Sequence, residues 1–161
     1  MNKRTWLLGS AAAVLVAVGG CATAPSPVSM TDTVARTPQL STLSKLISDA
    51  GLADTLRGPG PFTLFAPTDE AFKAVPAKTL AELAANKEML AAVLTFHVLP
   101  GKVMSADVKN GAAKTVNGAN VALAKSGTFV TVEDAVVQQA DVPATNGVVH
   151  LIDRVLIPPK K

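Results

Sequence analysis

Apolar residues near the start of the folded region recur at helical spacing. Leu40, Leu43, Ile47 and Ala50 lie three or four positions apart, so they fall on one face of a helix. Gly51 follows them, where a C-terminal cap belongs. The pattern predicts one amphipathic helix that ends at this glycine.

The next elements are a short strand and a second helix. Residues 62–66 are mostly apolar and follow a Gly-Pro-Gly-Pro turn, so they predict a strand. Thr68 then stands at an N-cap position, and Asp69 and Glu70 come at the positive end of the helix dipole. We expect this helix to end before Pro76.

The stretch from Thr79 to about Phe96 is predicted to be mostly helical. Its leucine and valine residues recur at spacings that make one buried face, with a break near Asn86. Residues 97–99 are predicted to continue as an extended segment that ends at Pro100.

After Gly111 the pattern changes to short alternating segments separated by turn residues. Asn-Gly and Ser-Gly pairs favour tight hairpin turns. The last segment is apolar throughout, which predicts a central strand covered on both faces. Helices followed by strands predict an α+β domain. The expected strands are residues 113–116, 120–124, 128–133, 136–142 and 148–157.

The N-terminus has the charge pattern of an export signal. Lys3 and Arg4 precede residues 6–20, which carry no charge, and Cys21 follows directly. A membrane-spanning helix needs about 20 apolar residues to cross ~30 Å of hydrocarbon, so this stretch is too short for one. We therefore expect export of the chain.

Cys21 is the only cysteine, and an unpaired thiol in an exported protein asks for an explanation. Residues 18–21, Val-Gly-Gly-Cys, resemble the lipobox of bacterial lipoproteins, although Gly19 replaces the more usual alanine, serine or threonine. The resemblance implies that residues 1–20 are a lipoprotein signal peptide and that acyl chains on Cys21 anchor the protein in a membrane. Ordinary cleavage beside an incidental cysteine is the alternative.

The segment after the cysteine is rich in Pro, Ser, Thr and Ala and has no apolar period. We predict a lipidated, flexible tether at residues 21–37, part of whose end can pack on the domain, and a folded domain at residues 38–161. Ala22, rather than aspartate, follows the cysteine, which favours the outer membrane in a Gram-negative cell envelope.

Removal of the signal changes the charge balance. Lys3 and Arg4 leave, so 13 of the 15 basic residues remain against 12 acidic ones. A net charge near +1 is not the footprint of a nucleic-acid-binding protein, and we expect no nucleic-acid partner.

Three segments together resemble the fasciclin-like domain family. Residues 62–72 are similar to the first fasciclin box and residues 146–153 to the second. Residues 96–101 are similar to the family's Tyr-His motif, with Phe96 in place of the tyrosine. The order and spacing of the three segments also agree with the family, over about residues 38–158.

The resemblance implies a wedge-shaped β-sandwich flanked by helices. It also implies adhesion or matrix attachment without enzymatic activity. In animal relatives an Asp-Ile pair before the second box contributes to integrin binding. Here Asp141 and Val142 stand at that place and are the candidate partner-binding residues, by analogy of fold alone.

The ionisable residues of these motifs are expected to have structural roles. His97 and His150 are the only histidines, and no third ligand stands at a spacing typical of a metal site. No phosphate loop or nucleophile elbow is present, so no metal, cofactor or catalytic residue is predicted. The residues assigned to the structural motifs are Thr68, Asp69, His97, Asn146, Gly147 and His150.

The leading hypothesis is an envelope-anchored lipoprotein that mediates cell adhesion or contacts with a protein or matrix partner. The alternative is a periplasmic lipoprotein that binds a small ligand or lipid, which requires an apolar pocket between sheet and helices. An enzyme would require a cleft that gathers His97 or His150 with carboxylates.

Overall fold

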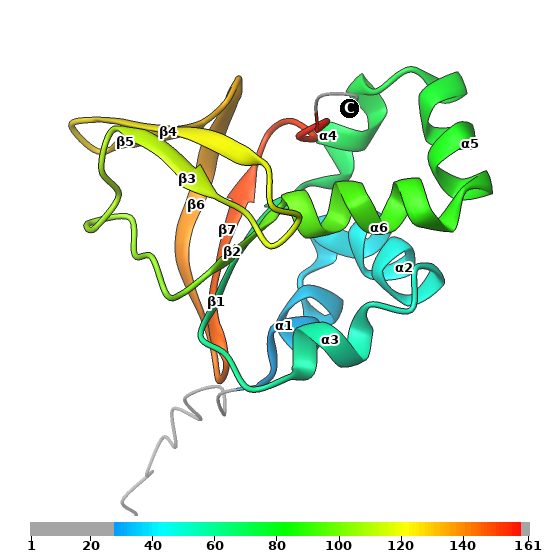
Figure 1. The fold of residues 1–161 in the computed structure, drawn as a ribbon, viewed down its shortest axis with the longest axis horizontal. Helices are drawn as coiled ribbons and strands as arrows, with labels where there is room; N and C mark the ends of the chain where they lie inside the picture. Colours follow the sequence, from blue (N-terminus) through cyan, green and yellow to red (C-terminus); the bar gives the residue numbers. More distant parts are fainter. Residues whose placement is uncertain (1–27, 159–161) are drawn as a thin grey trace, which may run out of the picture.

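The computed structural model describes residues 28–158. The predictions of a signal peptide, of lipid on Cys21 and of the first part of the tether lie outside these residues. Helices fill one side of the molecule and strands the other (Figure 1). The helical elements are α1 (Met30–Arg36), the 3₁₀ turn η1 (Pro38–Leu40), α2 (Ser41–Asp49), α3 (Ala53–Arg57), α4 (Asp69–Ala74), α5 (Ala77–Ala85) and α6 (Lys87–Phe96).

The strands form one seven-stranded sheet in the order β2-β1-β7-β6-β5-β4-β3. β1 and β7 pair in parallel, and every other neighbouring pair is antiparallel. The strands are β1 (Phe62–Pro67), β2 (Val98–Pro100), β3 (Gly111–Lys114), β4 (Asn120–Ser126), β5 (Phe129–Val132), β6 (Ala135–Ala144) and β7 (Gly147–Ile152).

The sheet bends until its two halves face each other as the leaves of a wedge-shaped sandwich (Figure 1). Register shifts interrupt the β6–β7 ladder between Val137 and Val142, and bulges of this kind increase the bend of a strand. The two edges of the sheet approach each other, because the amide of Val116 donates to the carbonyl of Val98 at 2.8 Å. This is the α+β fold that the sequence predicts.

Two apolar cores lie on opposite faces of the central strands. Leu64 and Val149 pack toward the helices, whereas Phe65 and Ile152 pack into the space between the two halves of the sheet. Strands covered on both faces are apolar throughout, and all six residues of β7 are buried. The predicted central strand is confirmed, although it ends at Ile152 rather than at residue 157.

The flexible tether predicted for residues 21–37 is wrong over the part that the structure describes. Residues 30–36 form α1, and Met30 and Val34 are fully buried in the helix-side core. Ser29 caps this helix by accepting a hydrogen bond from the amide of Asp32. The folded domain therefore begins before Pro38, because buried apolar side chains outweigh the tether-like composition of this segment.

The predicted helix ends agree with the structure where local capping determines them. Gly51 follows α2 with a φ of +70°, a conformation that favours glycine. The break predicted near Asn86 separates α5 from α6, and the side chain of Asn86 accepts from the amides of Glu88 and Met89. Within residues 28–158 no helix is both long enough and apolar enough to cross a membrane.

Candidate functional site

The Asn146–Gly147 turn joins β6 to β7 and links segments far apart in the chain. The side-chain oxygen of Asn146 accepts from the amide of Met30 at 2.9 Å. Its Nδ2 donates to the carbonyls of Leu56 and Gly58, at 2.5 and 3.2 Å. One side chain thus satisfies backbone groups from α1 and from the end of α3. The sequence predicted only a turn at Asn146–Gly147, without these contacts.

Gly147 allows β1 and β7 to approach each other. A Cβ atom at this position would lie 1.9 Å from the carbonyl oxygen of Phe62 and 2.9 Å from Cε of Met30. Phe62 is also the register partner of Gly147 in the parallel ladder. The fasciclin-box glycine is therefore the point where the two central strands begin to pair.

We expect Asn146→Ala to lower the free energy of unfolding by about 2 kcal/mol, because it removes three partly buried hydrogen bonds. Asn117→Ala is the matched control. It changes the other Asn-Gly turn, where the side-chain amide donates one hydrogen bond, to Ala92. Urea unfolding followed by circular dichroism measures both variants, and an equal loss in the two would contradict the linking role of Asn146.

His97 connects the end of α6 to the segment after β7. The ring is 1% exposed, its Nδ1 donates to the carbonyl of Val93 at 2.8 Å, and its Nε2 accepts from the amide of Leu156 at 3.0 Å. Burial lowers the pKa of His97 to about 4, against the opposing effect of the hydrogen bond to Val93. The imidazole is therefore neutral, and both ring nitrogens are used.

His150 on β7 is buried, and its ring stacks on that of Phe65 with the ring centroids 5.7 Å apart. Its Nε2 donates to the carbonyl of Val103 at 2.9 Å, and its Nδ1 accepts from the amide of Asp141 at 3.2 Å. All four nitrogens of the two histidines therefore have backbone partners. Neither ring offers a free nitrogen to a reaction or to a ligand.

Asp141 lies at a bulge of β6, in the left-handed conformation with a φ of +59°. Its carboxylate accepts from the amide of Ser105 at 2.8 Å and also from the hydroxyl of Ser105. Burial raises the pKa of this carboxyl, but the Ser105 hydrogen bonds, His150 and Lys125 outweigh it and hold the pKa below its usual value.

The two candidate partner-binding residues therefore have contacts inside the domain. Both carboxylate oxygens of Asp141 are hydrogen-bonded to Ser105, and Val142 packs against the helix-side core. These two hydrogen bonds hold the carboxylate against Ser105 and leave each of its oxygens with a further lone pair. Their role in partner binding stays a prediction.

The first fasciclin box links two helices. The hydroxyl of Thr68 accepts from the amide of Ala71 and caps α4. The carboxylate of Asp69 accepts from the amide of Thr42 at 2.8 Å and the hydroxyl of Ser41 at 2.7 Å, at the start of α2. Burial raises the pKa of Asp69, but these hydrogen bonds outweigh it and lower the pKa overall. The link to α2 was not foreseen from the sequence.

Two grooves adjoin the segment after β7, and no motif pointed to them. The first, which we call the apolar groove, has a volume of about 520 Å³ and lies between α5, α6, the β3–β4 turn and the C-terminal segment. The second, the polar groove, has about 500 Å³ and includes Glu133, Asp134 and Arg154. The apolar groove is lined mainly by Leu83, Met89, Ala92, Val93, Ala119 and Ile157.

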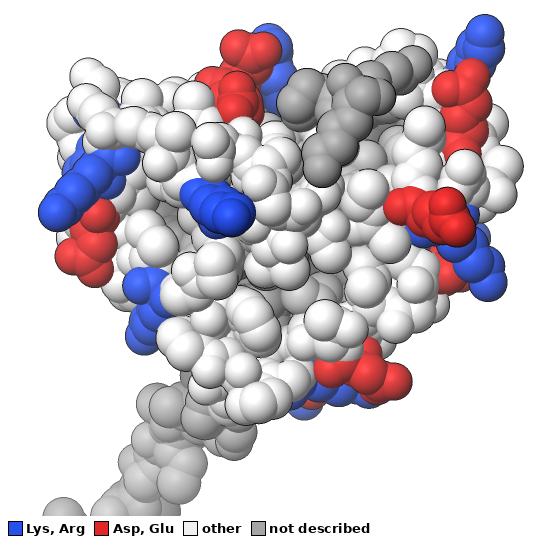
Figure 2. All heavy atoms as spheres, viewed as in Figure 1, with Lys and Arg blue, Asp and Glu red and all other residues white. Residues whose placement is uncertain are grey.

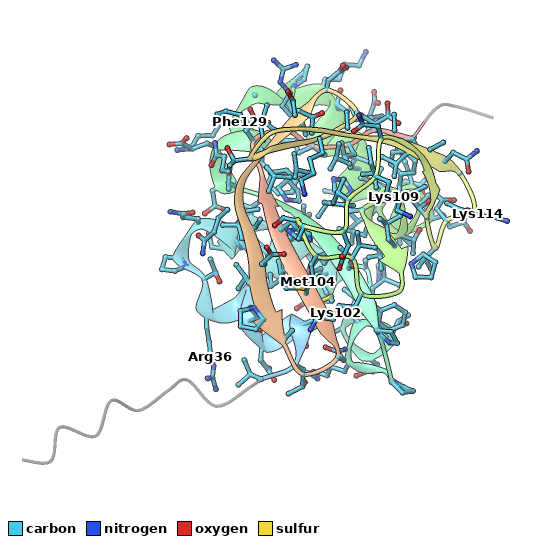
Figure 3. All side chains as sticks on the ribbon, turned by 90° about the vertical axis from the view of Figure 1, so that its left-hand side faces the viewer. Arg36, Lys102, Met104, Lys109, Lys114 and Phe129 are labelled. Atoms are coloured by element: carbon cyan, nitrogen blue, oxygen red, sulfur yellow. The ribbon has the colours of Figure 1, made fainter. Side chains whose placement is uncertain are left out.

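The rest of the surface has no single dominant charge. Acidic and basic side chains are interspersed on the face shown in Figure 2. Lys102, Lys109 and Lys114 are spread over another face, with Phe129 at its upper end (Figure 3). Phe129 is 68% exposed on the β4–β5 hairpin. Within residues 28–158 no three His, Cys, Asp or Glu side chains are grouped as metal ligands.

Known proteins are similar to this chain in sequence and in fold. Residues 38–158 match the Fasciclin domain model. Protein sll1483 of Synechocystis sp. is 39% identical over 145 residues, 89% of this chain and 81% of its own. Immunogenic protein MPB70 of Mycobacterium bovis is 39% identical over 76% of this chain and 65% of its own. Cell surface glycolipoprotein MPB83 of the same species is 35% identical over 76% of this chain and 57% of its own.

A solved structure supports the same fold. The domain pair from the insect cell adhesion molecule Fasciclin I superposes with a TM-score of 0.64 over 81% of this chain and 51% of that chain, at 17% identity. The boxes around Thr68 and Asn146, the buried motif histidine and the bent sheet all lie within the matched residues. The chain belongs to the fasciclin domain family.

Proposed function

We propose that this protein is an envelope-anchored lipoprotein whose fasciclin domain mediates cell adhesion or contact with a protein or matrix partner. Membership of the fasciclin family is the observation that carries the proposal. The relative named a cell surface glycolipoprotein and the likeness of fold to a cell adhesion molecule support it. The lipobox-like residues 18–21 supply the anchor in this proposal.

In this proposal, the place where the chain enters the domain decides which end of the domain faces the membrane. The carbonyl of Val28 accepts from the amide of Thr145 in the β6–β7 turn, at 2.9 Å. Phe129 lies at the opposite end of the molecule (Figures 1 and 3). Residues 22–27 span about 20 Å at most, at ~3.5 Å per residue. An anchored domain would present the β4–β5 hairpin away from the bilayer.

Comparison of wild type with Cys21→Ser on intact cells tests this proposal. We expect wild type in the membrane fraction and digested by external protease, and the variant absent from that fraction because it lacks acyl chains. Attachment of cells to a matrix-coated surface is expected to fall in the variant to the level of a deletion strain. Ser26→Ala, in the same segment, is the control and is expected to behave as wild type.

Two results would contradict the proposal. Unchanged attachment of the deletion strain would remove the adhesive role. Protection of the wild-type protein until the outer envelope is opened would favour a role inside the envelope.

The second candidate function is the binding of a small apolar ligand or lipid inside the envelope. The apolar groove favours it, because its volume of about 520 Å³ lies within the range of small-molecule sites. Such a site is mostly apolar with a few polar groups, and here Thr79, Glu82 and Asn117 are the polar members of the lining.

A further inference from the structure

The apolar and polar grooves adjoin each other. Ile157 lines both of them. Helix α6 contributes Val93 to the apolar groove and Phe96, one turn further, to the polar groove. The β3–β4 turn contributes Ala119 to the first, and Asn120, the first residue of β4, lines the second. Helix α6, residues 119–120 and the C-terminal segment therefore each line both grooves, and Ile157 lies where the two grooves meet.

The apolar groove leaves large hydrophobic side chains exposed to water. Met89 is 40% exposed and Ile157 is 58% exposed, and both lie in its lining. Exposure of this kind in a concave surface is typical of a binding site. Covering these side chains with an apolar chain would remove them from water and so favour binding.

The polar groove combines one cation with carboxylates. The ion pairs found within residues 28–158 involve Arg57 with Asp32 and Asp54, so the exposed Arg154 has no such partner there. The carboxylate of Glu133 accepts from the amide of Ala122 at 2.7 Å. Asp134 is exposed and makes no side-chain hydrogen bond in the described part of the chain. The groove therefore presents a guanidinium and a carboxylate to a ligand.

We propose that the two grooves together bind one molecule of a zwitterionic single-chain phospholipid, with its acyl chain in the apolar groove. The guanidinium of Arg154 matches the phosphate, since its planar fork donates two parallel hydrogen bonds to phosphate oxygens. The carboxylate of Asp134 matches the ammonium group. This inference rests on the second candidate function and names the class of its ligand.

The position of the grooves favours a single lipid molecule over a bilayer surface. The C-terminal segment that contains Ile157 lies at the end of the molecule away from the entry of the chain (Figure 1). A domain anchored by residues 22–27 would therefore hold the grooves away from its own membrane. The ligand would reach them as a free molecule.

The methionine methyl groups provide the test. The chain has four methionines, and within the described residues only Met89 lines a groove, whereas Met30 is in the core and Met104 lies on the face shown in Figure 3. The full chain, labelled with ¹³C at the methionine methyls, is titrated with lysophosphatidylethanolamine below its micelle concentration. We expect the Met89 signal to shift and to saturate, while those of Met30 and Met104 stay in place.

Two variants separate the tail from the headgroup. Ile157→Asp is expected to abolish the Met89 shift. Phe129→Asp, which also replaces an exposed apolar side chain with aspartate but lies outside the grooves, is expected to preserve it. Arg154→Gln is expected to weaken the binding of lysophosphatidylethanolamine about tenfold, because it loses one charged hydrogen-bonded contact. The affinity for octyl glucoside is expected to stay the same. Arg36→Gln is the control for Arg154→Gln.

Other outcomes would overturn the proposal. Equal affinity for lysophosphatidylethanolamine and lysophosphatidylglycerol would exclude the zwitterionic class. An unchanged affinity of Arg154→Gln for lysophosphatidylethanolamine would exclude the phosphate contact. A Met89 shift with phosphatidylethanolamine vesicles but not with the monomer would assign the grooves to a bilayer.

The result also separates this inference from the function on which it rests. A Met89 shift with octyl glucoside, without preference for the phospholipid, would retain ligand binding and reject only the proposed class. If no amphiphile shifts the Met89 signal, both the proposed ligand class and the ligand-binding function are rejected. The attachment experiment with Cys21→Ser does not depend on the grooves, so the adhesive role is decided separately.

Discussion

A Gly147→Ala variant is expected to lose about 4 kcal/mol of stability, the largest effect among the substitutions considered. Its new Cβ would lie 1.9 Å from the carbonyl oxygen of Phe62 and 2.8 Å from the carbonyl carbon. Both atoms belong to the backbone of a central strand, so a side-chain rotation cannot relieve the collision. The two strands would have to separate where the parallel ladder begins, with loss of packing on both faces.

Gly118→Ala is the matched control for this prediction. It lies in the other Asn-Gly turn, with a φ of +90°, and a Cβ there would meet no atom within 4 Å. It therefore reports the backbone strain alone, about 1 kcal/mol. Urea unfolding of both variants measures the difference, and similar losses in the two would show that the approach to Phe62 is unimportant.

The second large effect is a fall in stability of about 3 kcal/mol between pH 7 and pH 4, caused by His97. The pKa of His97 is about 4 in the folded protein and about 6.5 when unfolded, so the unfolded chain binds the extra proton between these values. Stability is therefore complete above about pH 6.5 and falls as the pH decreases toward 4. The free energy of unfolding in urea, measured across this range, tests the prediction.

Variants assign the pH effect to one residue. His97→Gln is expected to be less stable at pH 7, because it disturbs the bonds to Val93 and Leu156, and to lose most of the fall below pH 6.5. Asp69→Asn is expected to retain that fall. Hydrogen bonds to Ser41 and Thr42 outweigh burial and hold the pKa of Asp69 below its usual value, so the stability that it contributes is lost as the pH falls through this lowered pKa. A His97→Gln variant with the wild-type pH profile would contradict the assignment.

Features that depend on a few neighbouring residues could be predicted from the sequence. The cap at Thr68, the glycine after α2 and the break at Asn86 are each determined within one turn of helix. The apolar composition of residues 148–157 correctly predicted a strand covered on both faces, although that strand ends at Ile152. The motif spacing was specific enough to identify the family before any contact was known.

The candidate site was only partly predictable, because residue type does not reveal the partners of a side chain. The sequence did not reveal that both carboxylate oxygens of Asp141 accept hydrogen bonds from Ser105, and the partner-binding role of Asp141 stays a prediction. Asn146 was predicted as a turn residue, but its side chain joins α1 to the end of α3. The two grooves carry no sequence signal, since the lining of each comes from four separate parts of the chain.

The sequence by itself determined the cap of α4, the end of α2, the break at Asn86, the hairpin turns and the family. The tertiary structure decided that residues 30–36 are a helix in the core and that β1 pairs with β7. It also decided which backbone groups form hydrogen bonds with the two histidines. The reason is the range of the interactions. Caps and turns depend on hydrogen bonds between near neighbours, whereas the amide of Met30 is satisfied by a side chain 116 residues away.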